Sequence, residues 1–221
     1  MSDIYSFKII AILLPIALLI TTGLAFHLLA RQFGSKLGYF LGFLFYWIVW
    51  CFIVPVIFLT GQELKSLFEF NLCNFEKGRL LNLICLIIPL LFAYGYAFPK
   101  ALRSITFKII LLSLALALIN ATLEEILWRG LYLKLLGSNK WFYILTSSFG
   151  FGIWHFAPQL IFANKAPGGK FSFVAFAIIL GIFFSIVVFN TKSILLVSIC
   201  HILFDFSGLG GRLYLPKVIT K

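Results

Sequence analysis

Six ionisable side chains lie within apolar stretches of the sequence, where a charge is costly. They are three acids, one arginine and two histidines, namely Glu124, Glu125, Asp205, Arg129, His155 and His201. A charge at the centre of a bilayer costs about 2.5 to 3.5 kcal/mol on insertion scales, so six unpaired groups would cost roughly 15 kcal/mol. We therefore expect these side chains to face one another or a wet cavity, and they are the first candidates for a functional site.

Two of these groups are spaced to pair within one helix. Glu125 and Arg129 are four residues apart, which places them on one helical face and predicts a charge-assisted ion pair. Glu124 lies about 100° further round the same helix, and Asn120 is one turn back on its face. The sequence thus predicts a structural ion pair beside a second carboxylate that has Asn120 as its local partner.

The two histidines come from later segments, and each has a polar neighbour one turn beyond it. Gln159 follows His155 by four residues, and Asp205 follows His201 by four. Counted from one membrane face at about 1.5 Å per residue, Glu124, His155 and His201 reach depths of roughly 18, 21 and 12 Å. These three side chains are therefore predicted to meet in one layer of the protein.

The elements that must position these residues are membrane helices. Of the 221 residues, 62% are hydrophobic and 11% are charged, whereas a soluble domain has about 25% charged residues. A bilayer core about 30 Å thick needs roughly 20 apolar residues of helix. Seven stretches meet this requirement, at residues 7–29, 37–60, 80–98, 105–136, 141–162, 171–189 and 193–209.

The sequence therefore predicts an all-α fold, a polytopic transmembrane helical bundle of about seven to eight helices. We expect one structural unit, with N-terminal transmembrane helices in residues 1–104 and a core that carries the ionisable residues in 105–221. The fourth stretch is long enough to be kinked or broken. Residues 61–79 are expected to form a solvated loop or an interfacial helix.

The net charge of +11 does not indicate a nucleic-acid partner. The 18 basic residues are scattered singly between apolar runs, as is typical of charges that flank membrane helices. Loop lysines and arginines slightly favour a cytoplasmic C-terminus. The four cysteines form no C-x-x-C pair, so we expect neither a disulfide framework nor a structural zinc site.

The order of three motifs resembles the CPBP family, which comprises type II CAAX-prenyl endopeptidases, bacteriocin-processing proteins and abortive-infection proteins. The motifs are E-E-x-x-x-R, F-x-x-x-H and H-x-x-x-D, and their residues are Glu124, Glu125, Arg129, Phe151, His155, His201 and Asp205. The resemblance covers residues 111–208. The first hundred residues resemble the family in hydropathy alone.

The resemblance implies an intramembrane endopeptidase without a cofactor, with a peptide or membrane-protein substrate such as a prenylated C-terminal peptide or a leader peptide. It implies that Glu124, helped by His155, activates a water molecule, and that His201 and Asp205 stabilise the oxyanion. Asp205 stands where the best-known CAAX proteases have asparagine, and an ionised carboxylate cannot donate a hydrogen bond. Either Asp205 is protonated or it orients a protonated His201, and we favour the second interpretation. The family's distribution and the small size favour a bacterial inner membrane.

Two alternatives stay open at this stage. Glu124, His155 and His201 form a set of two histidines and one carboxylate that could hold zinc and a water molecule, although the sequence has no H-E-x-x-H motif. Buried carboxylates and histidines also build ion paths, so the bundle could be a transporter or a scaffold without catalysis.

Overall fold

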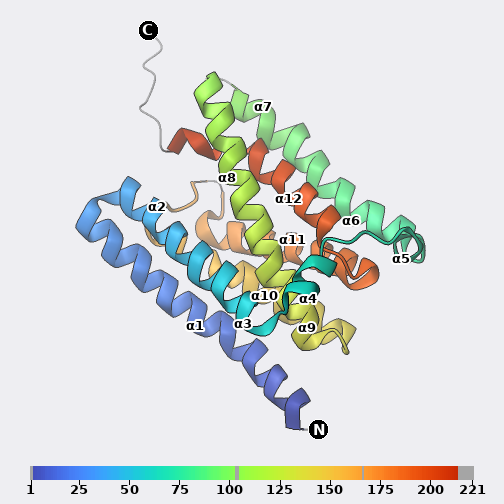
Figure 1. Ribbon diagram of the computed structural model, residues 1–221. Helices are drawn as coiled ribbons and strands as arrows, with labels where there is room; N and C mark the ends of the chain where they lie inside the picture. Colours follow the sequence, from blue (N-terminus) through green and yellow to red (C-terminus); the bar gives the residue numbers. More distant parts are fainter. Residues whose placement is uncertain (1, 103–104, 166, 214–221) are drawn as a thin grey trace.

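The computed structural model describes residues 2–102, 105–165 and 167–213, and all the regular secondary structure in them is helical. Figure 1 shows the helices packed as one bundle, with α1 and α2 as a hairpin on one side and α6 on the other. This arrangement confirms the predicted all-α helical bundle. Each of the seven apolar stretches is largely helical.

Five helical units are long and apolar enough to cross a membrane. Three of them are built from several consecutive helical segments, because π-helical turns interrupt the α-helix. The units are α1 (Ser2–Phe33), α2 (Ser35–Phe45) with a π-helical segment (Tyr46–Ile53) and α3 (Val54–Phe58), α6 (Arg79–Phe92) with a π-helical segment (Ala93–Ala97) and α7 (Phe98–Ala101), α8 (Phe107–Glu125) with a π-helical segment (Ile126–Leu131) and α9 (Tyr132–Leu136), and α11 (Gly169–Thr191).

Two further helices are shorter than the sequence predicted. They are α10 (Lys140–Trp154) and α12 (Leu195–Ser207). The prediction that the fifth stretch continues as helix to residue 162 is wrong, because α10 ends at Trp154 and a 3-10 turn follows at Pro158–Leu160. Proline has no backbone N–H to donate to the preceding helical turn, and the 3-10 turn begins at this residue. The consequence is that His155 lies at the end of α10, where the chain turns.

The fourth stretch is continuous and is not broken. Its α-helix passes at Ile126 into a π-helical segment and returns to α-helix at Tyr132. All residues from Leu127 to Leu131 are buried, which a regular amphipathic α-helix would not produce. These consecutive residues span about a full helical turn, so the segment is enclosed by neighbouring parts of the bundle on all sides.

Residues 61–79, predicted as a solvated loop or an interfacial helix, contain two short helices, α4 (Gly61–Ser66) and α5 (Leu72–Glu76). Thr60 caps α4, because its hydroxyl accepts from the N–H of Glu63 while the Glu63 carboxylate accepts from the N–H of Thr60. A final 3-10 turn at Gly210–Leu213 follows α12. It packs back on α8 through the N–H of Gly211, which donates to the Ser113 hydroxyl at 3.0 Å.

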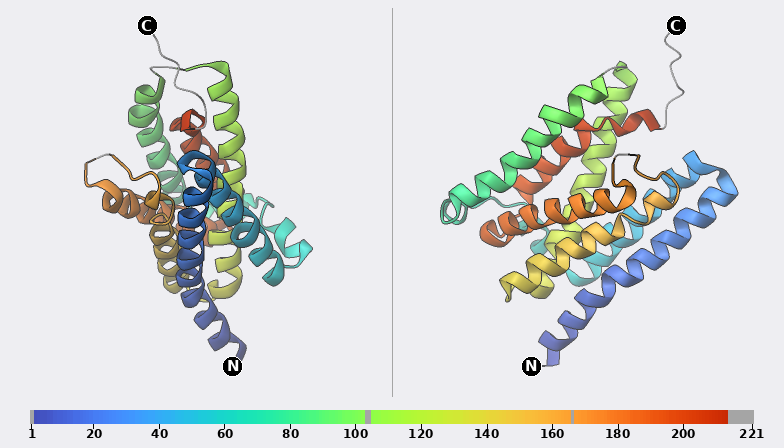
Figure 2. Two further views of the ribbon diagram at one scale, coloured as in Figure 1. Left: turned by 90° about the vertical axis from the view of Figure 1, so that its left-hand side faces the viewer. Right: turned by 180° about the vertical axis from the view of Figure 1, so that it is seen from behind.

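Small residues bring α10 and α11 into close contact. A Cβ atom added to Gly152 would lie 2.2 Å from Cγ1 of Ile178, so only glycine fits there. Nearby, the hydroxyls of Ser147 and Ser185 are 2.9 Å apart in a buried hydrogen bond. Packing through small and hydroxyl residues is typical of membrane helices. Figure 2 shows α10 and α11 side by side from behind, an arrangement that fixes the end of α10 and therefore His155.

Candidate active site

The ion pair predicted from the spacing of Glu125 and Arg129 is present at the centre of the bundle. Both side chains are fully buried, and Nη1 of Arg129 lies 3.1 Å from Oε1 of Glu125. The guanidinium group also lies over the ring of Phe151, 4.4 Å from its centroid. The π-helical segment that begins at Ile126 carries Arg129 into this position. The pair and the aromatic face compensate part of the cost of burying the arginine.

The ion pair extends to a second helix through His201. Nδ1 of His201 on α12 lies 2.7 Å from Oε1 of Glu125, and because an ionised carboxylate only accepts, Nδ1 carries a proton and donates. Spacing within one helix gave no indication of this contact. It fixes the orientation of the His201 ring and leaves Nε2 to face the rest of the site.

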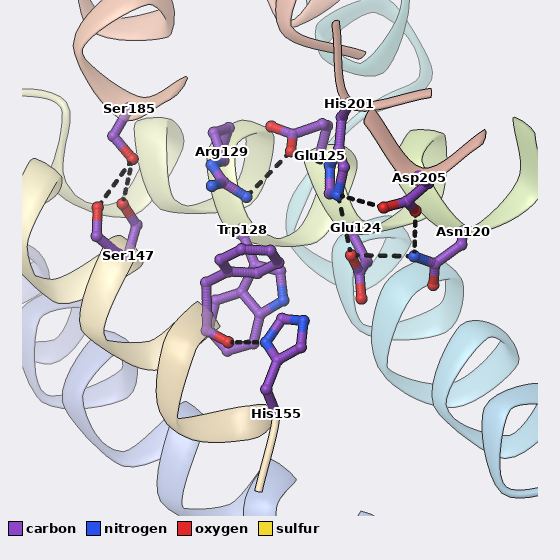
Figure 3. A network of polar contacts seen from close by, with 12 residues as sticks. Asn120, Glu124, Glu125, Trp128, Arg129, Ser147, His155, Ser185, His201 and Asp205 are labelled. Atoms are coloured by element: carbon purple, nitrogen blue, oxygen red, sulfur yellow. Dashed lines mark hydrogen bonds and ion pairs between the residues drawn. The ribbon is translucent and has the colours of Figure 1, made fainter. Parts of the chain in front are cut away.

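Glu124 is buried, with 1% of its surface exposed, and its two carboxylate oxygens differ. Oε2 accepts from Nδ2 of Asn120 at 3.3 Å and lies 3.7 Å from Nε2 of His201. Oε1 has no hydrogen-bond partner among the described residues. Figure 3 shows this carboxylate beside Asn120 and below His201. The predicted contact between Glu124 and Asn120 is therefore confirmed, and Oε1 of Glu124 is the carboxylate oxygen without a partner among the described residues.

Asp205 completes a group of three carboxylates around one imidazole. Its Oδ1 lies 3.5 Å from Nε2 of His201, as their four-residue spacing predicted, and its Oδ2 accepts from Nδ2 of Asn120 at 2.9 Å. Nε2 of His201 thus faces the acceptor oxygens of both Asp205 and Glu124. Either His201 carries protons on both nitrogens or one of these two carboxyl groups is protonated.

His155 follows the last residue of α10 and approaches the site from the opposite side. Its Nδ1 lies 2.7 Å from the carbonyl oxygen of Phe151 and donates to it, because a carbonyl can only accept. In the neutral ring, Nε2 is then an acceptor. Gln159 donates to the backbone carbonyl of His155 at 3.0 Å and not to its ring. Figure 3 shows Nε2 on the side of the ring away from the Phe151 carbonyl.

Two cavities connect these side chains. A cavity of about 290 Å³ is lined by Glu124, His155, Asp205 and Asn120 together with aromatic side chains. A larger and more apolar cavity of about 460 Å³ is lined by His155, His201 and Asp205 and extends between α6, α11 and α12. The two cavities share His155 and Asp205 in their lining, and between them they are lined by Glu124, His155, His201 and Asp205, whereas Glu125 and Arg129 line neither cavity.

The first helices contribute side chains that the sequence analysis did not single out. Tyr39 and Phe43 on α2 line the smaller cavity. Tyr46 stacks on Trp154 with ring centroids 3.8 Å apart, and Nε1 of Trp47 donates to Oδ1 of Asn120 at 2.9 Å. Aromatic residues make up 18% of the chain, so nothing in the sequence distinguishes these from ordinary packing residues.

The alternative zinc set is not assembled as a ligand cluster among the residues that the structure describes. Those residues contain no group of three or more histidine, cysteine or carboxylate side chains placed to hold a metal ion. Within the proposed set, Nδ1 of His155 is bonded to a backbone carbonyl and Nδ1 of His201 to Glu125. In each histidine the other ring nitrogen, Nε2, is therefore not used by these two hydrogen bonds.

A comparison with family models gives one match. Residues 104–207 match the model described as Rce1-like, type II CAAX prenyl endopeptidase. No curated protein and no solved structure matches the chain. The matched segment contains all six ionisable residues of the site, and α1 to α7 lie outside it.

Proposed function

Because residues 104–207 place the chain in the type II CAAX prenyl endopeptidase Rce1-like family of proteases, we propose that it is a glutamate-type intramembrane endopeptidase. It hydrolyses a peptide bond of a membrane-associated substrate, with a CAAX-like C-terminal peptide or a leader peptide as the candidate substrates. The five long apolar helices make it an integral membrane protein, and the bacterial inner membrane is the location that we propose.

One observation carries the proposal, namely the unequal environment of the two Glu124 oxygens. Asn120 and His201 hold Oε2, whereas Oε1 is buried without a hydrogen-bond partner among the described residues. Glu124 and His155 line the same cavity, and the neutral His155 ring offers an acceptor nitrogen there. An unsatisfied buried oxygen is costly. Oε2 of Glu125 is also without a partner among the described residues, but Glu125 lines neither cavity, so the distinguishing feature of Glu124 is a free oxygen on a residue that lines a cavity.

In the proposed reaction, a water molecule in the smaller cavity is oriented by Oε1 of Glu124 and Nε2 of His155. Glu124 takes one proton from the water as its oxygen attacks the carbonyl carbon of the peptide bond. The protonated Glu124 then gives this proton to the leaving amine as the C–N bond breaks. The immediate products are a carboxylic acid, which keeps the second proton of the water, and an amine. Transfer of that proton to the amine gives a carboxylate and an ammonium group, and Glu124 returns to its starting state. General-base catalysis of this kind contributes about a hundredfold to ten-thousandfold in rate.

The oxyanion of the tetrahedral intermediate needs a donor, and we assign this role to His201. Its Nδ1 donates to Glu125, and a protonated Nε2 would point between Glu124 and Asp205. An ionised Asp205 cannot donate to the oxyanion. Its contact with Nε2 at 3.5 Å fits a residue that orients a protonated His201. In this scheme Glu125 and Arg129 are positioning residues, because the first holds His201 and the second neutralises the first.

A cleavage assay with purified protein in detergent tests this proposal. The probes are two fluorogenic peptides, one prenylated with a CAAX-like C-terminus and one with an apolar leader-like sequence. We expect wild type to cleave at least one of them, and Glu124→Gln and His155→Ala to lose at least a hundredfold in turnover. Glu69→Gln is the matched control, because it makes the same change at an exposed loop residue. Unchanged turnover in both site variants would refute the proposed function.

A further inference from the structure

The amide of Asn120 bonds both carboxylates that face Nε2 of His201. Its Nδ2 donates to Oε2 of Glu124 at 3.3 Å and to Oδ2 of Asp205 at 2.9 Å. A primary amide has two N–H donors and one carbonyl acceptor, so these two contacts use both donors. Figure 3 shows Asn120 between the two carboxylates.

The third hydrogen bond of Asn120 comes from the N-terminal half of the chain. Nε1 of Trp47 donates to Oδ1 of Asn120 at 2.9 Å. An indole nitrogen is a donor only, so this contact fixes the amide with its oxygen toward Trp47 and its nitrogen toward the carboxylates. The flipped amide would place its oxygen against two carboxylates and its N–H groups against the indole N–H.

Trp47 lies on the second membrane-spanning unit, beside a residue that packs near His155. Trp47 belongs to the π-helical segment Tyr46–Ile53, and it is buried together with its neighbour Tyr46. Both rings face the interior of the bundle, although they come from adjacent residues. Tyr46 stacks on Trp154 beside His155, while Trp47 bonds Asn120 beside Glu124. One turn of the second span thus supports both sides of the site.

We propose that Asn120, oriented by Trp47, is a positioning residue that holds Glu124 and Asp205 to one amide and keeps Oε1 of Glu124 turned toward the cavity. The inference rests on the proposed function, because it assumes that Glu124 is the base. It also gives α2 and the π-helical segment a role in the reaction, although both lie outside the residues that match the family model.

A double-mutant cycle on Trp47 and Asn120 tests this inference. Asn120→Leu keeps the approximate volume and removes both donors, and Trp47→Phe removes the indole N–H and keeps an aromatic ring. Measured per folded molecule, we expect kcat to fall about ten- to a hundredfold in Asn120→Leu and about three- to tenfold in Trp47→Phe, with KM changed less than twofold. In the Asn120→Leu background, Trp47→Phe should have no further effect on kcat, because the indole acts through the amide.

Trp50→Phe is the matched control. It makes the same change one turn further along the helix, where Nε1 of Trp50 donates to the hydroxyl of Thr21 at 3.0 Å, away from the cavities. We expect its kcat to equal that of wild type. Unchanged kcat in Asn120→Leu, equal kcat in Trp47→Phe and Trp50→Phe, or additive effects in the cycle would each overturn the inference. Glu124→Gln in the same assay separates the two proposals, since full activity of that variant refutes the proposed function itself.

Discussion

Replacement of Glu125 by glutamine should destabilise the bundle more than removal of its arginine partner. Oε1 of Glu125 is shared between Nη1 of Arg129 at 3.1 Å and Nδ1 of His201 at 2.7 Å. Among the described residues, Arg129 has an ion pair with Glu125 alone. Glu125→Gln therefore leaves a buried guanidinium without a counter-ion. Arg129→Met leaves the Glu125 carboxylate with His201.

The number of partners that each charge loses determines how far the free energy of unfolding falls in each variant. Loss of one partner of a buried ion pair costs about 3 to 5 kcal/mol, whereas replacement of both charges is far less costly. We expect the free energy of unfolding to fall by about 4 kcal/mol in Glu125→Gln and by about 2.5 kcal/mol in Arg129→Met. The double variant should lose only about 2 kcal/mol, because no unpaired arginine is left in the interior.

The assay is reversible unfolding in mild detergent micelles on titration with a denaturing detergent, followed by tryptophan fluorescence. Glu76→Gln is the control, because Glu76 and Arg79 form an ion pair at 3.6 Å on the surface. Such exposed pairs contribute about 0.5 kcal/mol or less. A greater loss in Arg129→Met than in Glu125→Gln, or additive losses in the double variant, would refute this account of the pair.

Three further outcomes are expected. Exhaustive chelation should leave the rate of peptide cleavage unchanged, and a loss of activity that zinc restores would favour the zinc-dependent alternative. Gly152→Ala should lower the free energy of unfolding by about 1 to 3 kcal/mol, because the new methyl group would meet Ile178, whereas Gly61→Ala has open space around it and should have little effect. The hydrogen bond from Lys134 lowers the pKa of Glu63 to about 2 from its ordinary value of 4.5. The stability that this contact contributes is therefore present above pH 4.5 and declines as the pH falls toward 2, so the difference in unfolding midpoint between wild type and Glu63→Gln should be larger at pH 7 than at pH 3.

The contacts that could be predicted from the sequence are those within one helix. Hydropathy located the membrane helices, and a four-residue spacing correctly indicated the contacts of Glu125 with Arg129, of Asn120 with Glu124 and of His201 with Asp205. These predictions depend only on helical geometry. The rotation of one membrane helix against another leaves no comparable pattern in an apolar sequence. The contacts of Glu125 with His201 and of Trp47 with Asn120 therefore appeared only in the structure.

The irregular turns were also beyond the sequence analysis. The π-helical segments Tyr46–Ile53 and Ile126–Leu131 lie in runs of large apolar residues whose composition suits a regular helix equally well. Both segments carry buried side chains of the site, among them Arg129 and Trp47. The early end of α10 was missed for a similar reason, because hydropathy continues past Trp154 while the backbone turns before Pro158.

We propose that Glu124 acts as a base on water and does not itself bond to the substrate. Single-turnover cleavage in water enriched in heavy oxygen, followed by mass spectrometry, tests it directly. We expect one heavy oxygen atom in the new carboxylate of the peptide product, none in the enzyme fragment that contains Glu124, and no product from Glu124→Gln. Heavy oxygen in the Glu124 side chain after turnover, or labelled product from Glu124→Gln at the wild-type rate, would contradict it.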